Sequence, residues 1–381
     1  MNNVPNLLMA VPLLLCLGTR GWALTFAIQT VDSAGYVGEF PSLALDGSDH
    51  PHISYFEDIN DNLKHATYDG VSWHIATVDS AGKVGEYTSL ALDGSGRPRI
   101  SYSDYTNGDL KYAAYDGSSW RIETVDSTGD IGKHTSLALD GSGRPRICYQ
   151  NWTNPYDADL KYASYDGTSW RIATVDSAGD VGYDTSLALD GNGRPHISYF
   201  YWTKGDLKYA TRDGTSWRIQ TVDSAGAVGW STSLVLDSSG RPRISYYDDN
   251  GKDLKYASYN GSSWEIETVD SGGWVGFRTS LALDGAGHPH ISYYDITNKD
   301  LKYAAYDGSS WQIVTVDAAG DVGGFTSLAL DSHGYPHIAY HDWINQDLKY
   351  AVGIPEPSTL LLLHAGALGL LAWARRTCRG R

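Results

Sequence analysis

The chain has 381 residues, of which 41% are hydrophobic, and a formal net charge of −16. The hydrophobic content favours a folded core over disorder, and the length allows two ordinary domains or one large domain built from repeats. The negative charge argues against nucleic-acid partners, because binding to a phosphate backbone requires a basic surface.

Residues 1–23 are predicted to form a secretory signal peptide. The segment "LLMAVPLLLCLG" is an apolar core of suitable length, and "GWA", ending at Ala23, resembles a small-residue cleavage site. No Lys or Arg precedes the apolar core. The alternative, an ordinary apolar first strand, is disfavoured by Pro12 and by the lack of alternation. We therefore expect export with cleavage after Ala23.

Residues 24–352 contain one recurring unit, which is marked most clearly by "TVDS" or "TVDA". Its aspartates are Asp32, Asp79, Asp126, Asp176, Asp223, Asp270 and Asp317. The spacing is 47 residues except for one spacing of 50, which reflects a three-residue insertion in "QNWTNPYDADL". A period in the mid-forties with four strand-like segments per unit is typical of β-propeller blades.

Residues 89–126 illustrate the four strands predicted for each blade, at 89–93, 99–104, 109–116 and 120–126. Pro98 stands where the second strand begins, the position at which a missing backbone donor costs least. We expect the first strand to line a central channel and the fourth to lie outermost. The "DGSGRP" and "YDGSSW" turns then share one face of the propeller. The other face is formed by the crossovers, which are the "VDSAG.VG" segments that lead from one blade to the next, and by the loops between the second and third strands.

The last repeat lacks a fourth strand, and the N-terminal strand supplies one. Six fourth strands begin with tryptophan, at Trp73, Trp120, Trp170, Trp217, Trp264 and Trp311. The seventh equivalent is Phe26, in "FAIQTVD", which has no first three strands before it. The predicted fold is therefore all-β, a seven-bladed β-propeller of four-stranded blades whose ring is closed by the N-terminal strand.

The C-terminal segment has three parts. Residues 353–357 contain Pro355-Glu356-Pro357, residues 358–374 are almost wholly apolar, and residues 375–381 begin with Arg375 and Arg376. The apolar run would be roughly 25 Å long as a helix, which is just enough to cross a bilayer core. We expect a transmembrane helix followed by a basic cytoplasmic tail.

This order of parts resembles the PEP-CTERM sorting signal of Gram-negative bacteria, although His364 is a polar departure inside the helix. The resemblance implies that an exosortase-type enzyme processes the chain near the Pro-Glu-Pro motif. It also implies a precursor anchored in the inner membrane that is later passed to the cell surface or released outside the cell.

The face that carries the crossovers is predicted to form a binding rim. When the seven units are aligned with one another, the residues at equivalent positions (columns) of this face vary, while the rest of the repeat is nearly constant. Aromatic rings and carboxylates beside a channel mouth suit stacking on, and hydrogen bonding to, a glycan or a peptide. The candidate residues are Tyr87, Asp104, Tyr105, Trp152, Tyr183, Trp202, Trp230, Asp248, Phe277, Arg278, Asp295, Asp342 and Trp343. The alternative is that loop positions drift freely and the aromatics only cover the blade ends.

No catalytic residue, cofactor or metal site is predicted. His50 and His52 are of metal-ligand type, but the same columns hold arginines such as Arg97 and Arg99 in other repeats, which a metal site would not accept. Cys148 occupies a column of Ser and Ala, so we expect it to be a small buried residue.

These patterns favour an exported, surface-sorted module that binds or scaffolds without catalysis, with exopolysaccharide or another matrix component as the partner. One alternative is a polysaccharide hydrolase or lyase that uses rim carboxylates such as Asp104, Asp248 and Asp295. A purely structural matrix protein is the other.

Overall fold

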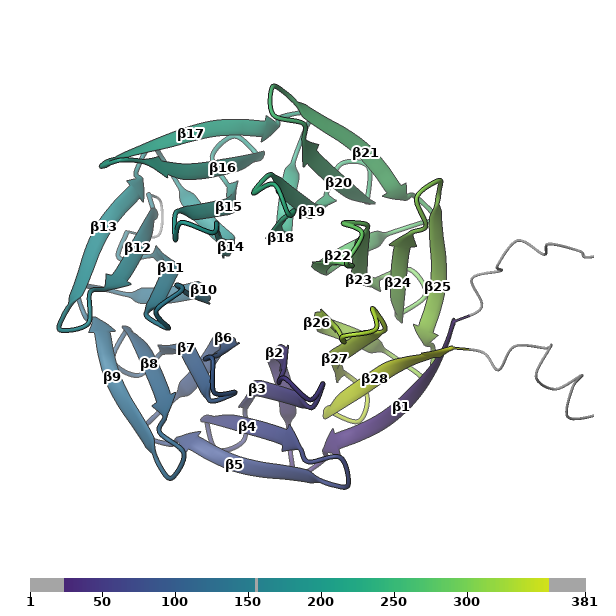
Figure 1. The fold of residues 1–381 in the computed structure, drawn as a ribbon, viewed down its shortest axis with the longest axis horizontal. Helices are drawn as coiled ribbons and strands as arrows, with labels where there is room; N and C mark the ends of the chain where they lie inside the picture. The colour runs from purple at the N-terminus through teal and green to yellow at the C-terminus, as the bar shows by residue number, and fades with distance from the viewer. Residues whose placement is uncertain (1–23, 155–156, 356–381) are drawn as a thin grey trace, which may run out of the picture. The chain divides into compact units, whose positions relative to one another are not determined.

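The computed structural model describes residues 24–154 and 157–355. They form seven four-stranded antiparallel sheets arranged as blades around a central axis (Figure 1). The predicted seven-bladed propeller is confirmed. The leader, the apolar run 358–374 and the basic tail lie outside these residues, and within them no helix is long and apolar enough to span a membrane.

The strands fall into four concentric positions, and the predicted inner and outer order is confirmed (Figure 1). The inner strands are β2 (Val37–Leu45), β6 (Val84–Leu92), β10 (Ile131–Leu139), β14 (Val181–Leu189), β18 (Val228–Leu236), β22 (Val275–Leu283) and β26 (Val322–Leu330). The second strands are β3 (Pro51–Glu57), β7 (Pro98–Asp104), β11 (Pro145–Asn151), β15 (Pro195–Tyr201), β19 (Pro242–Asp248), β23 (Pro289–Asp295) and β27 (Pro336–Asp342). The third strands are β4 (Asn62–Tyr68), β8 (Asp109–Tyr115), β12 (Asp159–Tyr165), β16 (Asp206–Asp213), β20 (Asp253–Tyr259), β24 (Asp300–Tyr306) and β28 (Asp347–Pro355). The outer strands are β5 (Trp73–Asp79), β9 (Trp120–Asp126), β13 (Trp170–Asp176), β17 (Ser216–Asp223), β21 (Trp264–Asp270), β25 (Trp311–Asp317) and β1 (Leu24–Asp32).

The first and last strands of the propeller meet in one blade. Its sheet has the order β1-β28-β27-β26, so the N-terminal strand is the outer strand of the C-terminal blade (Figure 1). Every other blade is built from four consecutive strands. The seam between the two ends is therefore where the sequence predicted it.

The inner strands are longer than the sequence suggested. Residues 84–88 were expected to belong to a crossover, but β6 starts at Val84 and its pairing with β7 shifts between Glu86 and Ser89. Gly85 has a φ of +108°, and a Cβ there would lie 2.8 Å from the Cα of Leu63 in the preceding blade. The strand therefore enters the blade at a position that only glycine can occupy. It then forms a β-bulge.

The core lies between neighbouring blades. In one representative cluster, Leu110 and Val125 of one blade pack against Ile131, Ile147 and Tyr149 of the next. Equivalent clusters recur around the ring, and one of them joins Val31 of β1 to Val37 and Leu348 across the seam. Both faces of each sheet are therefore covered, which agrees with strands that are apolar on both sides.

Two recurring side-chain hydrogen bonds tie each blade to the next. Each serine of the "SLAL" segment accepts the backbone N–H of a leucine in the next inner strand, and Ser327 closes the circle by accepting from Leu43 N at 3.0 Å. Each second-strand tyrosine donates its hydroxyl to the "VD" aspartate of the preceding blade, as Tyr55 does to Asp32 at 2.6 Å. The repeated Ser, Tyr and Asp residues therefore form hydrogen bonds that hold neighbouring blades together.

A third interblade hydrogen bond is formed at six of the seven junctions between neighbouring blades, and it is missing at the seam. Ser–Thr pairs such as Thr88 and Ser54 are hydrogen-bonded at 2.7 Å, and Cys148 takes the serine position with its thiol on Thr185 at 3.1 Å. At the seam the same two columns hold Ala339 and Pro41. Both polar partners are lost together there, so no hydroxyl is left without a partner.

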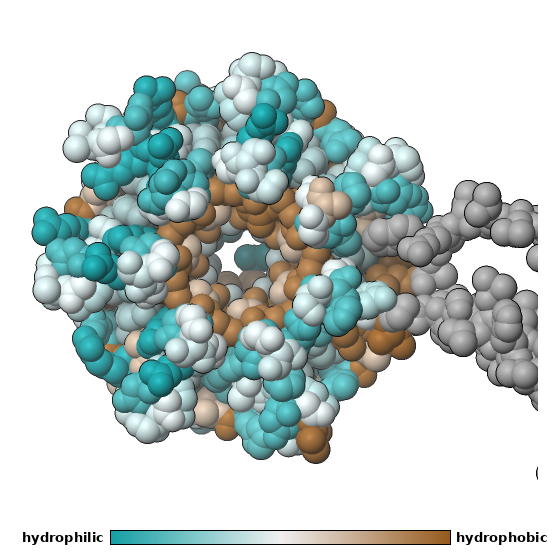
Figure 2. All heavy atoms as spheres, in the orientation of Figure 1, coloured by the Kyte–Doolittle hydropathy of each residue, from teal (hydrophilic) through white to brown (hydrophobic). Residues whose placement is uncertain are grey.

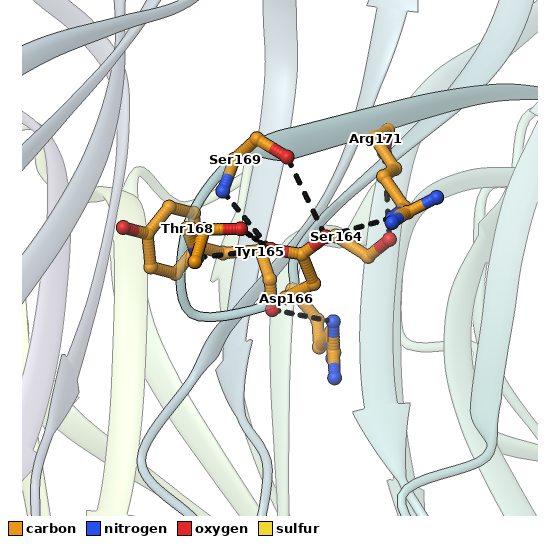
Figure 3. Close-up of polar contacts among 7 residues, drawn as sticks. Ser164, Tyr165, Asp166, Thr168, Ser169 and Arg171 are labelled. Atoms are coloured by element: carbon orange, nitrogen blue, oxygen red, sulfur yellow. Dashed lines mark hydrogen bonds and ion pairs between the residues drawn. The ribbon is translucent and has the colours of Figure 1, made fainter.

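The "YDGSSW" turns are held by their own aspartates. In the turn between β12 and β13, Asp166 Oδ1 accepts the N–H groups of Thr168 and Ser169, both at 2.9 Å (Figure 3). The Thr168 hydroxyl and these N–H groups, together with Arg171, hold the pKa of Asp166 well below its usual range. This is the side-chain to backbone bonding typical of tight turns.

Candidate binding face

The crossovers and the loops between second and third strands lie together at one end of the blades, here called the crossover face. Backbone hydrogen bonds join them: Tyr105 N donates to Lys83 O at 2.9 Å, and Trp343 N donates to Asp321 O at 2.9 Å. Loops braced in this way hold their variable side chains in fixed positions, which a binding surface requires.

Seven equivalent residues, one from each inner strand, surround the axis at this face. Each has a left-handed backbone with φ between 47° and 56°. They are Phe40, Tyr87, His134, Asp184, Ser231, Arg278 and Phe325. Together with the residue that follows each of them, they line a cavity of about 210 Å³, here called the axial cavity. Figure 2 shows the opposite end of the central opening, on the side of the hairpins between the first and second strands, where residues of hydrophobic character surround it.

One side of the axial cavity is aromatic. The ring centroids of Phe325 and Phe40 are 4.4 Å apart, those of Phe40 and Tyr87 are 4.6 Å apart, and those of Tyr87 and His134 are 4.6 Å apart. Burial raises the pKa of Tyr87 to about 12, so its hydroxyl stays protonated at neutral pH. This arc presents aromatic carbon with one phenol and one imidazole.

The other side is polar. His134 Nδ1 lies 3.0 Å from Asp184 Oδ1, and Ser231 N donates to Asp184 Oδ2 at 2.7 Å. Burial by itself raises the pKa of Asp184. The hydrogen bond and charge of His134, with help from Arg278 and the Ser231 N–H, outweigh burial and bring that pKa to about 2. Asp184 is therefore an ionised carboxylate whose two oxygens are both engaged.

Three predicted rim aromatics, together with Phe200, form a continuous cluster that leads to the axial cavity. Trp202 is 52% exposed and stands edge-on to Trp230, with ring centroids 5.0 Å apart. Trp230 stacks on Phe200 at 4.4 Å. Tyr183 lies 5.6 Å from Trp202 and 5.6 Å from His134. A ligand on Trp202 could thus extend towards the axis over aromatic surface.

The remaining predicted aromatics are distributed around the rim. Tyr105 is exposed and lies beside the ammonium of Lys83, while Lys133 Nζ stands 3.7 Å from the ring centroid of Trp152. Trp343 is exposed, with its ring 5.6 Å from that of Phe325. Phe277 lies under Arg278, with the guanidinium 5.2 Å from the ring centroid.

The predicted rim carboxylates are turned into the loop framework. Asp104 is fully buried, accepts the side-chain amide of Asn107 at 2.8 Å and pairs with Lys111 at 3.0 Å. Asp295 and Asp342 bond the equivalent asparagines in the same way, and Asp248 bonds backbone N–H groups of its loop. These four side chains shape the loops beneath the rim and are not displayed on its surface.

The axial ring contains five residues that the sequence analysis did not select: Phe40, His134, Asp184, Ser231 and Phe325. They occupy the same repeat column as Tyr87 and Arg278, which were selected. The usable signal was that this single column differs in almost every unit. Among the described residues, no group of three or more His, Cys, Asp or Glu is arranged to hold a metal ion.

Comparison with known protein families identifies a sorting signal at the C-terminal end of the chain. Residues 353–376 match the family model for the PEP-CTERM protein-sorting motif. The chain carries a PEP-CTERM sorting motif. This motif indicates export and sorting to the cell surface and implies processing by an exosortase. No curated protein matches the chain.

Several solved propellers share the fold at low sequence identity. AofleA from Arthrobotrys oligospora is 15% identical over 77% of this chain and 90% of its own, with a TM-score of 0.51. A variant of the Aleuria aurantia lectin in complex with α-methyl-L-fucoside is 17% identical over 76% and 97%, also with a TM-score of 0.51. A polysaccharide lyase of family PL25, an ulvan lyase, is 14% identical over 87% and 97%, with a TM-score of 0.55. At these identities the likeness concerns the fold alone.

Proposed function

We propose that this protein is a surface-sorted, non-catalytic propeller that binds glycan on its crossover face. The observation that carries the proposal is the exposed indole of Trp202, which is held edge-on by Trp230 and joined by Tyr183 to the axial cavity. An aromatic ring fixed by its neighbours offers a flat apolar face to the C–H side of a sugar at little entropic cost.

The destination of the chain and its fold both support a glycan ligand. A protein sorted to the cell surface meets exopolysaccharide and other matrix glycans there, and we infer that the apolar run 358–374 anchors the precursor in the inner membrane before processing. The fold is shared with a lectin solved with a fucoside and with an ulvan lyase. Those ligands belong to those proteins, so the likeness is compatible with glycan binding and does not select a sugar.

Binding is favoured over catalysis because of where the carboxylates lie. A hydrolase would need two carboxyl groups facing a shared space, yet Asp104, Asp248 and Asp295 are buried in hydrogen bonds within their loops. The exposed rings of Trp202 and Tyr105 on this face are suited to stacking and hydrogen bonding.

Glycan-array binding of the purified exported protein tests the proposal. The double variant Trp202→Ala/Trp230→Ala should lose most of the signal, since an aromatic stacking contact is worth about 0.5–1.5 kcal/mol beyond the area that it buries. Trp264→Ala on the opposite face is the matched control and should keep it, with thermal unfolding recorded for all variants. Equal retention by the wild type and the double variant would contradict the rim proposal, and an array without any binder would favour a purely structural matrix protein.

A further inference from the structure

We propose that the axial cavity binds the carboxylate of an acidic sugar residue through Arg278 and Ser231. This inference rests on the proposed glycan-binding function and names the chemical class of the sugar that would reach the axis. It adds a second, deeper subsite to the aromatic rim.

Arg278 is the main reason for expecting an anion. Its guanidinium is stacked 4.2 Å from the ring centroid of Phe325 and 5.2 Å from that of Phe277. Among the described residues, no hydrogen bond or ion pair is formed by this guanidinium. A guanidinium carries five N–H donors in a rigid plane, and its stacking on Phe325 fixes that plane. These donors are therefore oriented and available at the wall of the cavity.

Ser231 provides the second, independent observation. The residue is only 7% exposed and lines the cavity beside Arg278, yet its Oγ has no hydrogen-bond partner within the described chain. Its backbone N–H is already given to Asp184. A buried hydroxyl without a partner costs free energy, and a ligand oxygen at this position would supply the missing bond.

Two of the three acidic groups near the cavity, Asp184 and Glu86, are already engaged. Asp184 is satisfied by His134 and by Ser231 N, and Glu86 pairs with Lys83 at 2.9 Å. The pKa of Glu39 is raised by burial and by the charges of Asp58 and Glu86, although the charges of Lys83 and Arg278 act the other way. Within the described part of the chain no carboxylate pairs with the Arg278 guanidinium, so its N–H groups are available to an acceptor on a ligand.

A carboxylate is the acceptor that fits this arrangement best. Its two oxygens match the guanidinium fork in a bidentate pair, and one of them can also accept from Ser231 Oγ. Phe325 carries the guanidinium, and the neighbouring rings of Phe40 and Tyr87 are available to cover the C–H face of the sugar ring. The cavity of about 210 Å³ is smaller than the ~300–1,000 Å³ of sites for drug-sized ligands, so it would admit a single sugar unit.

The position on the axis also fixes the stoichiometry. Each blade contributes one ring residue, and Arg278 and Ser231 occur once each in that ring. The expected ratio is therefore one acidic sugar per chain, in contrast to a site repeated in every blade.

Isothermal titration of the purified exported protein with methyl β-D-glucuronoside and methyl β-D-glucoside tests the inference, because the two probes differ only in the carboxylate. We expect one glucuronoside per chain and binding of the glucoside at least about 10-fold weaker. Arg278→Gln should weaken glucuronoside binding ~10–100-fold, as expected for loss of a charged hydrogen-bonding partner. Arg278→Lys keeps the charge without the fork and should give an intermediate loss, and Ser231→Ala should give a few-fold loss.

The control is Arg218→Gln on β17, which makes the same change in net charge at a side chain that is 70% exposed on an outer strand. It should bind like the wild type. Equal binding of the two methyl glycosides, an unaffected Arg278→Gln with wild-type thermal stability, or equal losses in Arg278→Gln and Arg218→Gln would each overturn the inference. Competition by inorganic sulfate as strong as that by the glucuronoside would do so too, since it would indicate a simple anion site. Array signals that depend on Trp202 but not on Arg278 would refute the axial subsite alone and leave the proposed function standing.

Discussion

Removal of β1 should open the propeller, because this strand is the outer edge of the blade that joins the two chain ends. Without it, the buried side chain of Val31 leaves the seam cluster, which costs ~1.5–3 kcal/mol. Tyr55 also loses its 2.6 Å hydrogen bond to the Asp32 carboxylate, which costs another ~1.5–3 kcal/mol. The sum of ~3–6 kcal/mol takes a large share of a typical folding free energy of ~5–15 kcal/mol, and β28 is left as an unpaired edge.

The assay compares versions of the chain that begin at Leu24 or at Ser33, both produced without the leader and otherwise intact. The shorter chain should unfold at lower temperature and urea concentration, and protease should cut it first in β28 or β27. A synthetic peptide of residues 24–34, added in excess, should restore part of the resistance by pairing with β28. A shorter chain that melts and resists protease like the longer one would refute the reasoning about the seam.

Three further predictions concern single positions. Ala339→Ser places a hydroxyl at a fully buried site without its threonine partner and should lower the free energy of unfolding by ~1–3 kcal/mol. Adding Pro41→Thr should recover part of that loss, so a double-mutant cycle in urea that shows no coupling would contradict the pairing of these columns. Asp184 has a folded pKa of about 2, below its unfolded value of ~3.9, so the stability it contributes is present above pH ~4 and is lost as the pH falls towards 2. Asp184→Asn should therefore narrow the difference in urea midpoint between pH 5 and pH 2.5, and an unchanged difference would count against the His134 pair. Ser231→Gly relieves a left-handed backbone and should be as stable as the wild type or up to ~1 kcal/mol more stable, as measured by urea unfolding. It should nevertheless bind the glucuronoside more weakly, since the Ser231 hydroxyl is gone.

The fold could be predicted almost entirely because each unit repeats the same strand chemistry. The seven "VD" aspartates and the fourth-strand tryptophans count the blades, and Phe26 in the tryptophan column locates the seam. The limits of the inner strands could not be predicted. Their first residues include a glycine with positive φ and a bulge, as at Gly85 and Glu86, and these break the alternation by which a strand is recognised.

The candidate site was only partly predictable for a similar reason. Sequence variation among the units located the crossover face and picked out Tyr87 and Arg278, but it cannot tell an exposed side chain from one turned inwards. Asp104 and Trp202 occupy adjacent positions of the repeat, at the end of the second strand. Asp104 is nevertheless buried and paired with Lys111, whereas Trp202 is half exposed. That difference depends on the lysine and asparagine partners that the fold brings to the carboxylate.

The backbone of the axial ring gives the strongest argument that its side chains matter. A left-handed conformation costs a residue with a side chain ~1–2 kcal/mol relative to glycine, and this chain uses glycine freely elsewhere in the same bulge, as at Gly85 and Gly229. None of the seven ring positions is glycine, and only His134 and Asp184 belong to the other residue types (Asn, Asp and His) that are enriched in this conformation. The ring residue also differs from unit to unit. If these side chains only filled the centre of the propeller, the same residue could be repeated in all seven units. A strained position that keeps diverse side chains aimed at one cavity is what a single asymmetric ligand requires.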